Sequence, residues 1–500
     1  MKPETLRIFC AVLSLLLLLP VIAACGSKEA SPAADTVPEG GETDVATEAE
    51  TTLHMPDLPE NDWGGYEFNF LISSNDELGK VKNDIKADEQ TGDTVNDARY
   101  ERNLKTEEKY GIKLSTLECN AGTGGDGLKK FRASVAAGDA SFDAAFMGGY
   151  DACVLAQEGM LYDLNSLPYI DLTNEWWDQK ANADLTIKGR MFYTTGDIST
   201  ADNDATYVIM FNKTLVKNYG LEDFYQDVYD GKWTLDVFKA AASSVHEDLN
   251  GNGEADVEDR FGILIWDDSM MGIVNSTGTK CCTVNPSGEI ELTIYNDKVV
   301  NAIASFFEVA FDNQIGLTYQ RSKYSGWDGV LSLDMFSNDQ ALFFMRLLLD
   351  VANLRNMEAD FGLLPYPKSD ETVDAYYQTL GSWHSVFLCV PMTTSDPERT
   401  GIVLEAMAAE SMYTVTPAYY DVALKGKYAR DEESLDMLDI ILESRCYDLG
   451  WFYAIGGYNE EVMNLLRNFK PDFTSMYEKR TKNAYKLIDK INTAFAEIDG

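Results

Sequence analysis

Short apolar runs alternate along the chain with longer amphipathic segments. The runs are rich in aromatic and β-branched residues, which is typical of buried strands, and the segments between them have helical spacing. The first predicted strands are 66–74, 112–118 and 142–147, and the helices that separate them are 93–110, 127–137 and 152–160. Strands that alternate with helices in this way predict βαβ units and a mostly parallel sheet.

A second set of elements follows a loop that carries Trp176 and Trp177. The predicted strands of this set are 207–212, 340–345, 361–365 and 386–391, and the main helices are 213–219, 235–245, 296–312 and 474–498. Thr234 stands directly before one of these helices and is a candidate N-cap. The chain has no internal repeat.

The N-terminus reads as an export signal. Lys2 and Arg7 precede an apolar stretch at 8–24, which ends in small residues directly before Cys25. A cysteine at this place resembles the lipobox of bacterial lipoproteins, which implies that Cys25 becomes a lipidated N-terminus carrying palmitate or a similar chain. The alternative is a transmembrane anchor, for which the stretch is short. The acidic segment 25–61 has few large apolar residues and reads as a disordered tether.

Composition excludes several classes of function. The 500 residues include 41 Lys and Arg against 82 Asp and Glu, a formal net charge of -41. Such a chain repels nucleic acid and anionic membrane surfaces. No G-x-S-x-G, H-E-x-x-H, P-loop or C-x-x-C motif occurs, and the chain has 3 His. We therefore expect no enzymatic activity, no zinc site and no cofactor beyond the metal considered next.

The segment 248–259 fits the spacing of a calcium-binding loop of the EF-hand type, with Gly253 at the sixth position. The predicted ligands are Asp248, Asn250, Asn252, Glu254, Asp256 and Asp259. Asp259 departs from the pattern, because the last ligand is usually a bidentate glutamate. A structural calcium ion is one interpretation, and a tight Asn/Asp/Gly turn without metal is the other.

Several segments occur in an order that resembles the family 1 extracellular solute-binding proteins, especially clostridial-type lipoproteins. They are GDTVNDARYERN at 92–103, FNK at 211–213, DGKWT at 230–234, LRNMEADFG at 354–362 and PAYYD at 417–421. The resemblance extends over about residues 62–497. It implies a two-lobed α/β fold of the type II periplasmic-binding-protein kind, with a ligand cleft between lobes that are joined by a hinge.

The resemblance also implies a function and a domain plan. Such a protein captures a small solute by hinge closure and delivers it to the permease of an ABC transporter, and a mono- or oligosaccharide is the default solute. We expect a monomer anchored to the cell membrane, facing the outside, or the periplasm where an outer membrane exists. The expected parts are 1–24 (signal peptide), 25–61 (tether), 62–200 (lobe 1), 201–335 (lobe 2), 336–395 (return to lobe 1) and 396–500 (helices shared between the lobes).

Candidate ligand-binding residues stand at loop-rich strand ends, where the clefts of α/β proteins form. Aromatic rings pack on the apolar face of a sugar, and polar side chains bind its hydroxyls. The candidates are Tyr150, Asp151, Trp383, Trp266, Asp267, Asn203, Asp204, Trp327, Ser74 and Asn75.

Two other functions are compatible with the sequence. An exported glycan hydrolase would use paired carboxylates. A chain with 82 acidic residues always contains some pair at catalytic distance, so such a pair does not indicate a hydrolase. A binding protein for a peptide, a polyamine or a phosphorylated polyol, in some cases feeding a sensor, would share the fold. A cationic ligand would bind less well at high salt, whereas a neutral sugar would not.

Overall fold

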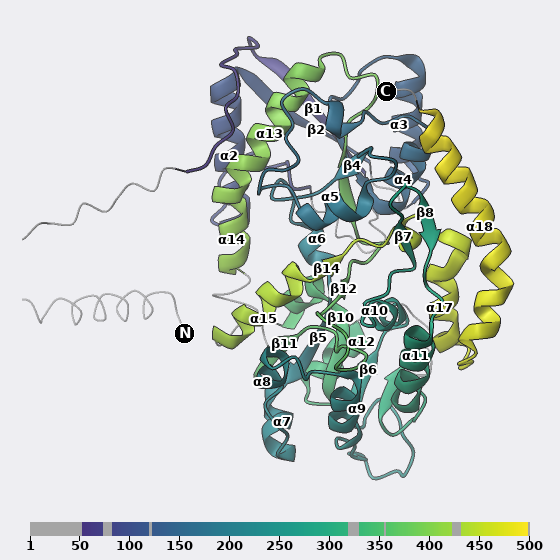
Figure 1. Cartoon of the computed structure of the whole chain (residues 1–500). Helices are drawn as coiled ribbons and strands as arrows, with labels where there is room; N and C mark the ends of the chain where they lie inside the picture. The colour runs from purple at the N-terminus through teal and green to yellow at the C-terminus, as the bar shows by residue number, and fades with distance from the viewer. Residues whose placement is uncertain are drawn as a thin grey trace, which may run out of the picture. The chain divides into compact units, whose positions relative to one another are not determined.

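The computed structural model describes residues 53–73, 83–119, 123–318, 330–354, 357–422 and 432–498. The chain forms two units, Met1–His54 and Met55–Gly500, and the second unit contains all the elements below. Two separate five-stranded sheets organise this unit (Figure 1). The predicted two-lobed α/β fold is therefore confirmed, with one lobe built around each sheet.

The first sheet has the strand order β2-β1-β3-β13-β4. Its strands are β1 (Tyr66–Ser73), β2 (Ile112–Glu118), β3 (Ala144–Gly148), β4 (Tyr193–Thr194) and β13 (Val386–Cys389). β2 and β3 run parallel to β1, whereas β13 runs antiparallel to β3 and to β4. β3 and β13 are almost entirely buried, because helices cover both faces of the sheet.

Helices α2 (Thr94–Tyr110), α13 (Pro397–Tyr413) and α14 (Val415–Val422) lie on one side of this sheet, and α3 (Asp126–Ala137) and α4 (Gly149–Gln157) lie on the other (Figure 1). Asp93 caps α2 by accepting the backbone N–H of Asn96. Gly111 ends α2 in the left-handed conformation, where a β-carbon would lie 1.9 Å from Asp62 Oδ1. Any larger residue at Gly111 is therefore strained and crowded.

The second sheet has the order β11-β5-β10-β6-β9. Its strands are β5 (Tyr207–Asn212), β6 (Phe261–Ile265), β9 (Gly316–Thr318), β10 (Ala341–Leu347) and β11 (Phe361–Leu364). Its main helices are α7 (Lys213–Tyr219), α8 (Phe224–Tyr229), α9 (Leu235–Ser243), α11 (Asp297–Ala310), α12 (Val330–Ser337) and α15 (Glu432–Glu443). Thr234 occupies the N-cap position of α9, but its side chain makes no capping hydrogen bond.

Strands β10 and β11 lie within the range 336–395, which we expected to return to the first lobe. Both instead pair with β5, through contacts such as Phe343 with Phe211 and Phe361 with Asn212, and so belong to the second sheet. The return occurs only at β13. Hydropathy alone does not distinguish the two sheets, since strands of both are buried apolar runs.

The remaining elements join the two lobes or extend them. They are α5 (Gln179–Leu185), α6 (Ala201–Asp204), α10 (Ser269–Asn275), α16 (Leu449–Phe452), α17 (Tyr458–Arg467), α18 (Phe473–Glu497), β7 (Cys282–Val284), β8 (Ile290–Leu292), β12 (Gln378–Thr379) and β14 (Arg445–Cys446). α18 contacts α4 of the first lobe and α11 of the second. In the described part of the chain, no helix is long and apolar enough to span a membrane.

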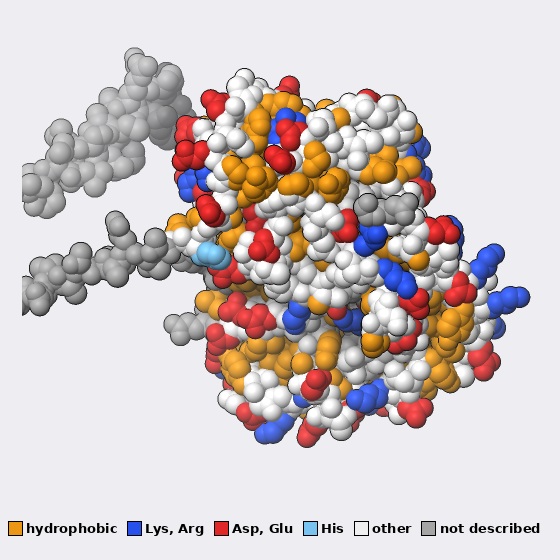
Figure 2. Space-filling model, turned by 45° about the horizontal axis from the view of Figure 1, so that its top comes forward, with side chains coloured by type: hydrophobic (Ala, Val, Ile, Leu, Met, Phe, Trp, Pro, Cys, Tyr) orange, Lys and Arg blue, Asp and Glu red, His pale blue; other side chains and the backbone are white. Residues whose placement is uncertain are grey.

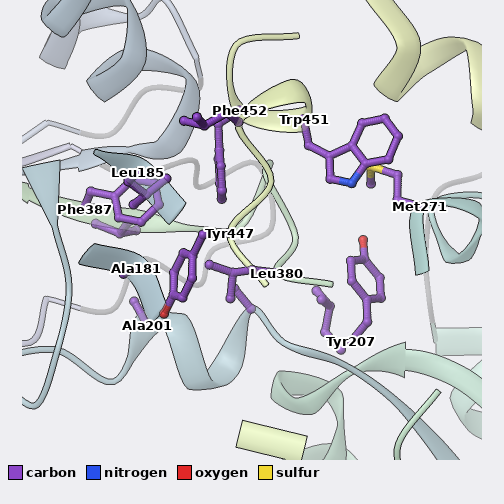
Figure 3. Packing of buried hydrophobic residues seen from close by; sticks show 14 of the residues in the cluster. Ala181, Leu185, Ala201, Tyr207, Met271, Leu380, Phe387, Tyr447, Trp451 and Phe452 are labelled. Atoms are coloured by element: carbon purple, nitrogen blue, oxygen red, sulfur yellow. The ribbon is translucent and has the colours of Figure 1, made fainter. Parts of the chain in front are cut away.

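The chain passes between the lobes at a place that we call the crossing. There Thr206, before β5, bridges Leu380, before β13, and β12 pairs in parallel with β14. Tyr447 packs beside Leu380, Ala201 and Ala181 in this region (Figure 3). The crossing is therefore a packed joint rather than a loose linker.

Charge is dispersed on the face of the molecule that Figure 2 shows. On the face seen in Figure 2, acidic and basic side chains are interspersed. The acidic excess of the whole chain does not gather into one patch on that face.

Candidate functional site

The ends of strands from both sheets face the crossing. β1, β2 and β3 are parallel, and the antiparallel β13 begins at the edge where they end. In the second sheet β6 and β10 end at the edge where the antiparallel β5 begins. Thr206, directly before β5, bridges Leu380, in the segment between β12 and β13, and this bridge connects the two edges. Ligands of open α/β sheets bind at such edges.

On the first lobe, Tyr150 is held by a relay of hydrogen bonds. It follows β3 as the second residue of α4, and Asn459 Nδ2 donates to its hydroxyl at 3.0 Å. The Tyr150 hydroxyl also lies 2.9 Å from Ser382 Oγ, and either of these two hydroxyls can donate in this contact. Burial raises the pKa of Tyr150, which keeps its hydroxyl protonated.

An aromatic ring and an unpaired acceptor accompany Tyr150. The ring of Trp383 packs edge-on at 6.1 Å between centroids and remains 39% exposed. Asn459 is buried, and its Oδ1 has no hydrogen-bond partner among the described residues. An exposed ring beside a buried acceptor without a donor is the arrangement expected where a hydroxyl-bearing ligand binds.

On the second lobe, the residues that follow β6 contact charged side chains. The Arg346 guanidinium covers the Trp266 ring at 4.1 Å from its centroid, and Arg346 Nε donates to Asp350 at 2.8 Å. Asp267 forms an ion pair with Arg467 at the end of α17. Burial raises the pKa of Asp267 above its ordinary value.

Asp268, the next residue, is the most perturbed carboxyl of this group. Burial and the neighbouring charge of Asp267 raise the pKa of Asp268 to about 7. Tyr207 donates to its Oδ2, while Oδ1 is buried with no partner in the described part of the chain. We call Tyr150, Asn459, Trp383, Trp266, Asp267 and Asp268 the strand-end site.

Three predicted residues are placed differently. Asp151 is turned toward the Gly124 backbone N–H at 2.9 Å, inside the first lobe. Asn203 accepts Arg445 Nη1 at 2.6 Å, and Asp204 accepts the Tyr419 hydroxyl at 3.1 Å, on the α14 side of the crossing. The predicted residues Trp327, Ser74, Asn75 and the lipidation residue Cys25 lie outside the described residues.

A separate polar cavity of about 140 Å³ lies beside the first passage of the chain between the lobes; we call it the crossing cavity. Its lining residues are Glu175, Trp176, Trp177, Asp178, Gly196, Asp197, Ser199, Asp202, Asn203, Thr416 and Arg445. Arg445 donates to Asp178 at 2.7 Å and to Asp202 at 2.9 Å. Sequence reasoning missed this group apart from Asn203, because Arg445 and Asp202 are 243 positions apart and no motif joins them.

Two carboxyl groups of the crossing cavity are strongly perturbed. Burial raises the pKa of Asp202 to about 6, with Asp178 adding to the effect and Arg445 opposing it. Burial likewise raises the pKa of Asp197 to about 6, although the Thr416 hydroxyl donates to it at 2.6 Å. A carboxylate charge is costly in this environment without further cationic partners.

The predicted calcium loop is closed by its own hydrogen bonds. Asp248 accepts the backbone N–H groups of Gly251 and Gly253 at 2.7 and 2.8 Å, and Asp259 accepts those of Leu249 and Asp256 at 3.1 and 3.0 Å. Among the described residues, no three His, Cys, Asp or Glu side chains are grouped as a metal site. Calcium binding by amide and carbonyl oxygens with these carboxylates stays a prediction.

Comparison with known proteins agrees with this fold. The sequence model of the bacterial extracellular solute-binding protein family matches residues 91–263, so the resemblance to family 1 solute-binding proteins is confirmed. No curated protein matches the chain by sequence. The chain is thus similar to extracellular solute-binding proteins in the matched segment and in its fold.

Solved structures of such proteins share the architecture. The galacto-N-biose-/lacto-N-biose I-binding protein of Bifidobacterium longum, in complex with lacto-N-biose, is 11% identical, with 86% of this chain and 99% of that chain covered and a TM-score of 0.57. UgpB of Mycobacterium tuberculosis, in complex with glycerophosphocholine, is 16% identical, with 85% and 99% covered and a TM-score of 0.55. At such identities the similarity establishes the fold alone.

Proposed function

We propose that the protein captures a mono- or oligosaccharide at the strand-end site and delivers it to the permease of an ABC transporter. Closure of the two lobes about the crossing would bring Trp383 of the first lobe and Trp266 of the second lobe against the sugar. The chain would catalyse no reaction, in keeping with the binding proteins that it resembles.

The observation that carries this proposal is a pair of buried acceptors that lack donors among the described residues. Asn459 Oδ1 stands beside Tyr150 and Trp383, and Asp268 Oδ1 stands beside Tyr207 and Arg346. Leaving a buried acceptor unpaired costs about 1–3 kcal/mol, and a ligand hydroxyl would recover this loss. Trp383 would supply the apolar surface on which a pyranose ring packs.

A phosphorylated or amine-bearing solute is the alternative within the same fold. UgpB is seen in complex with glycerophosphocholine, whereas the Bifidobacterium protein is seen with lacto-N-biose. Arg346 and Arg467 contact residues of the strand-end site, but both are paired with carboxylates. This pairing favours a neutral, hydroxyl-rich solute over an anionic one.

We further propose that Cys25 is lipidated and tethers the protein to the cell membrane through the acidic segment 25–61. The support is the sequence before Cys25 and the family match to extracellular proteins. A Cys25→Ser variant is expected to leave the membrane fraction for the soluble fraction. Retention of this variant in the membrane would contradict the lipid anchor.

A thermal-shift panel on the full chain tests the solute class. It would compare mono- and oligosaccharides with polyols, peptides and polyamines. A solute at 100 times its dissociation constant adds about 2.7 kcal/mol to the free energy of unfolding and raises the melting temperature by several degrees. A shift with a sugar that is recovered chemically unchanged supports the proposal. A cleaved sugar would indicate a hydrolase, and a shift with peptides or polyamines alone would overturn the sugar assignment.

A further inference from the structure

The crossing cavity contains an acidic group that the strand-end site does not use. Asp178, Asp197 and Asp202 all line it, together with Glu175, while Arg445 is its one basic lining residue. Asp178 and Asp202 each accept a hydrogen bond from Arg445 through Oδ2. The lining thus carries more carboxylate groups than a single guanidinium neutralises.

One oxygen in the cavity wall is left without a donor. Asp202 is 3% exposed, and its Oδ1 has no hydrogen-bond partner among the residues that the structure describes. Hydrogen bonding by the backbone N–H groups of Asn203 and Asp202 also acts on this carboxylate and lowers its pKa, against the larger effect of burial. Buried carboxylate oxygens are otherwise nearly always paired, so this one points to an additional donor.

Neighbouring groups define what that donor must be. Asp197, which also faces the cavity, accepts the Thr416 hydroxyl through Oδ1 and is half-buried. Among the described residues, in this cavity and elsewhere, no three His, Cys, Asp or Glu side chains are grouped as a metal site. A donor that carries both N–H groups and positive charge would satisfy Asp202 and lower the cost of the surrounding carboxylates.

We propose that the crossing cavity binds a small organic cation through an ammonium or guanidinium group, which donates to Asp202 Oδ1 and to Asp197. The cavity, at about 140 Å³, admits such a group. None of the strand-end site residues lines it. The proposal goes beyond the proposed sugar function and does not depend on it.

Titration of the full chain with ethylammonium chloride and with guanidinium chloride at low millimolar concentration tests this. Potassium chloride at equal ionic strength controls for general attraction to the acidic chain. We expect saturable binding by calorimetry, at least tenfold weaker in Asp202→Asn and Asp197→Asn, because each removes a charge-assisted acceptor. Asp197→Asn keeps the Asp178–Arg445–Asp202 contacts and so tests the site even if Asp202→Asn fails to fold.

Two further variants distinguish the crossing cavity from the exposed acidic surface and from the strand-end site. Asp126→Asn removes an equally charged but exposed carboxylate, and Trp383→Ala alters the strand-end site; both should bind the organic cations like the unmodified chain. Equal heats from potassium and the organic cations would overturn the proposal, as would unchanged affinity in Asp197→Asn. Loss of cation binding in Trp383→Ala would place the cation in the strand-end site instead.

Discussion

Asn459 donates a hydrogen bond to the hydroxyl of Tyr150 at 3.0 Å across 309 positions of the sequence. Tyr150 follows β3 of the first sheet, whereas Asn459 belongs to α17, which packs on α10 of the second lobe. This contact therefore fixes a side chain of the first lobe against a helix that the second lobe carries. It also leaves Asn459 Oδ1 without a donor among the described residues, so that a ligand can supply one.

Trp383→Ala should weaken sugar binding about tenfold, or ~1.4 kcal/mol, because the exposed ring supplies apolar contact area. The melting temperature should change little, since the ring is 39% exposed. Calorimetric titration with the best sugar measures the effect. Tyr485→Ala, which removes a ring that is 49% exposed on α18, is the matched control and should bind normally. Equal affinity in the Trp383 and Tyr485 variants would remove Trp383 from the site.

Asp268→Asn should change how stability depends on pH. The folded state raises the pKa of Asp268 to about 7, so it holds a proton that the unfolded chain releases in the window from about pH 4 to pH 7. The free energy of unfolding must therefore fall as pH rises through this window. The free energy of unfolding of the asparagine variant lacks this fall. Relative to the unmodified chain, the variant should therefore be more stable at pH 8 than at pH 5, by on the order of 1 kcal/mol or more. Urea unfolding at the two pH values measures it, and parallel pH profiles would refute the assignment.

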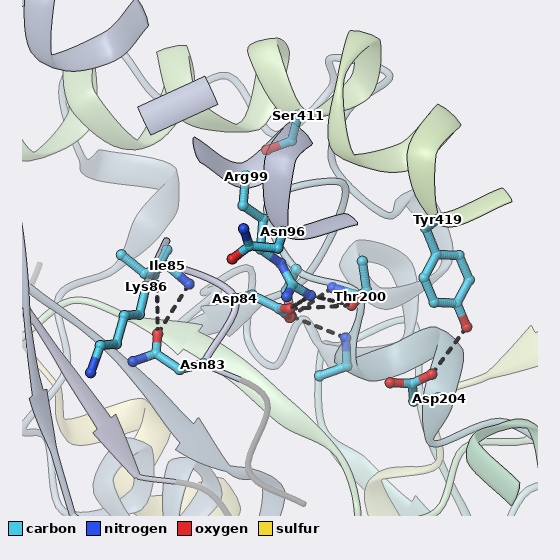
Figure 4. A network of polar contacts seen from close by, with 12 residues as sticks. Asn83, Asp84, Ile85, Lys86, Asn96, Arg99, Thr200, Asp204, Ser411 and Tyr419 are labelled. Atoms are coloured by element: carbon cyan, nitrogen blue, oxygen red, sulfur yellow. Dashed lines mark hydrogen bonds and ion pairs between the residues drawn. The ribbon is translucent and has the colours of Figure 1, made fainter. Parts of the chain in front are cut away.

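Asp84→Ala should be strongly destabilising. Asp84 is buried and accepts Ser199 Oγ at 2.8 Å and the Thr200 N–H at 2.8 Å, and it pairs with Arg99 (Figure 4). Its removal leaves these donors unpaired at the entry to the crossing, which should cost about 3 kcal/mol.

Urea denaturation measures the Asp84→Ala effect. Asp126→Ala is the control, because its ion pair with Lys129 is exposed and should leave the midpoint unchanged. Similar midpoints for the two variants would show that the Asp84 network adds nothing to stability.

The predicted calcium loop is tested by melting the chain with calcium and with chelator. Calcium bound at 248–259 should raise the melting temperature, and Asp248→Asn should abolish the rise, since it removes the first ligand and its charge. A melting temperature that does not change with calcium would identify the loop as a turn closed by the hydrogen bonds of Asp248 and Asp259 to backbone amides.

Much of the fold followed from the sequence, because local patterns determine its elements. The predicted strand 207–212 and helix 213–219 coincide with β5 and α7, and the last predicted helix, 474–498, differs from α18 by one residue at each end. The assignment of β10 and β11 to a lobe did not follow, since pairing with β5 depends on contacts distant in sequence.

The strand-end site was predicted only in part. Tyr150, Trp383, Trp266 and Asp267 could be proposed from the sequence because each follows or precedes a recognisable strand, and their contact with a ligand stays a prediction. Asn459 carries no such signal: it lies in a C-terminal helix and reaches Tyr150 through tertiary packing. Asp151 accepts a hydrogen bond from the Gly124 backbone, and its place next to Tyr150 in the sequence does not reveal this contact.

Calorimetric titration of the full chain and of Asn459→Ala with the sugar that stabilises the protein most tests the central claim directly. The proposed site predicts saturable, single-site binding to the unmodified chain, at least tenfold weaker binding to Asn459→Ala, and sugar recovered unchanged. Equal affinity of the two proteins, or binding of peptides or polyamines with no sugar bound at all, would contradict the account.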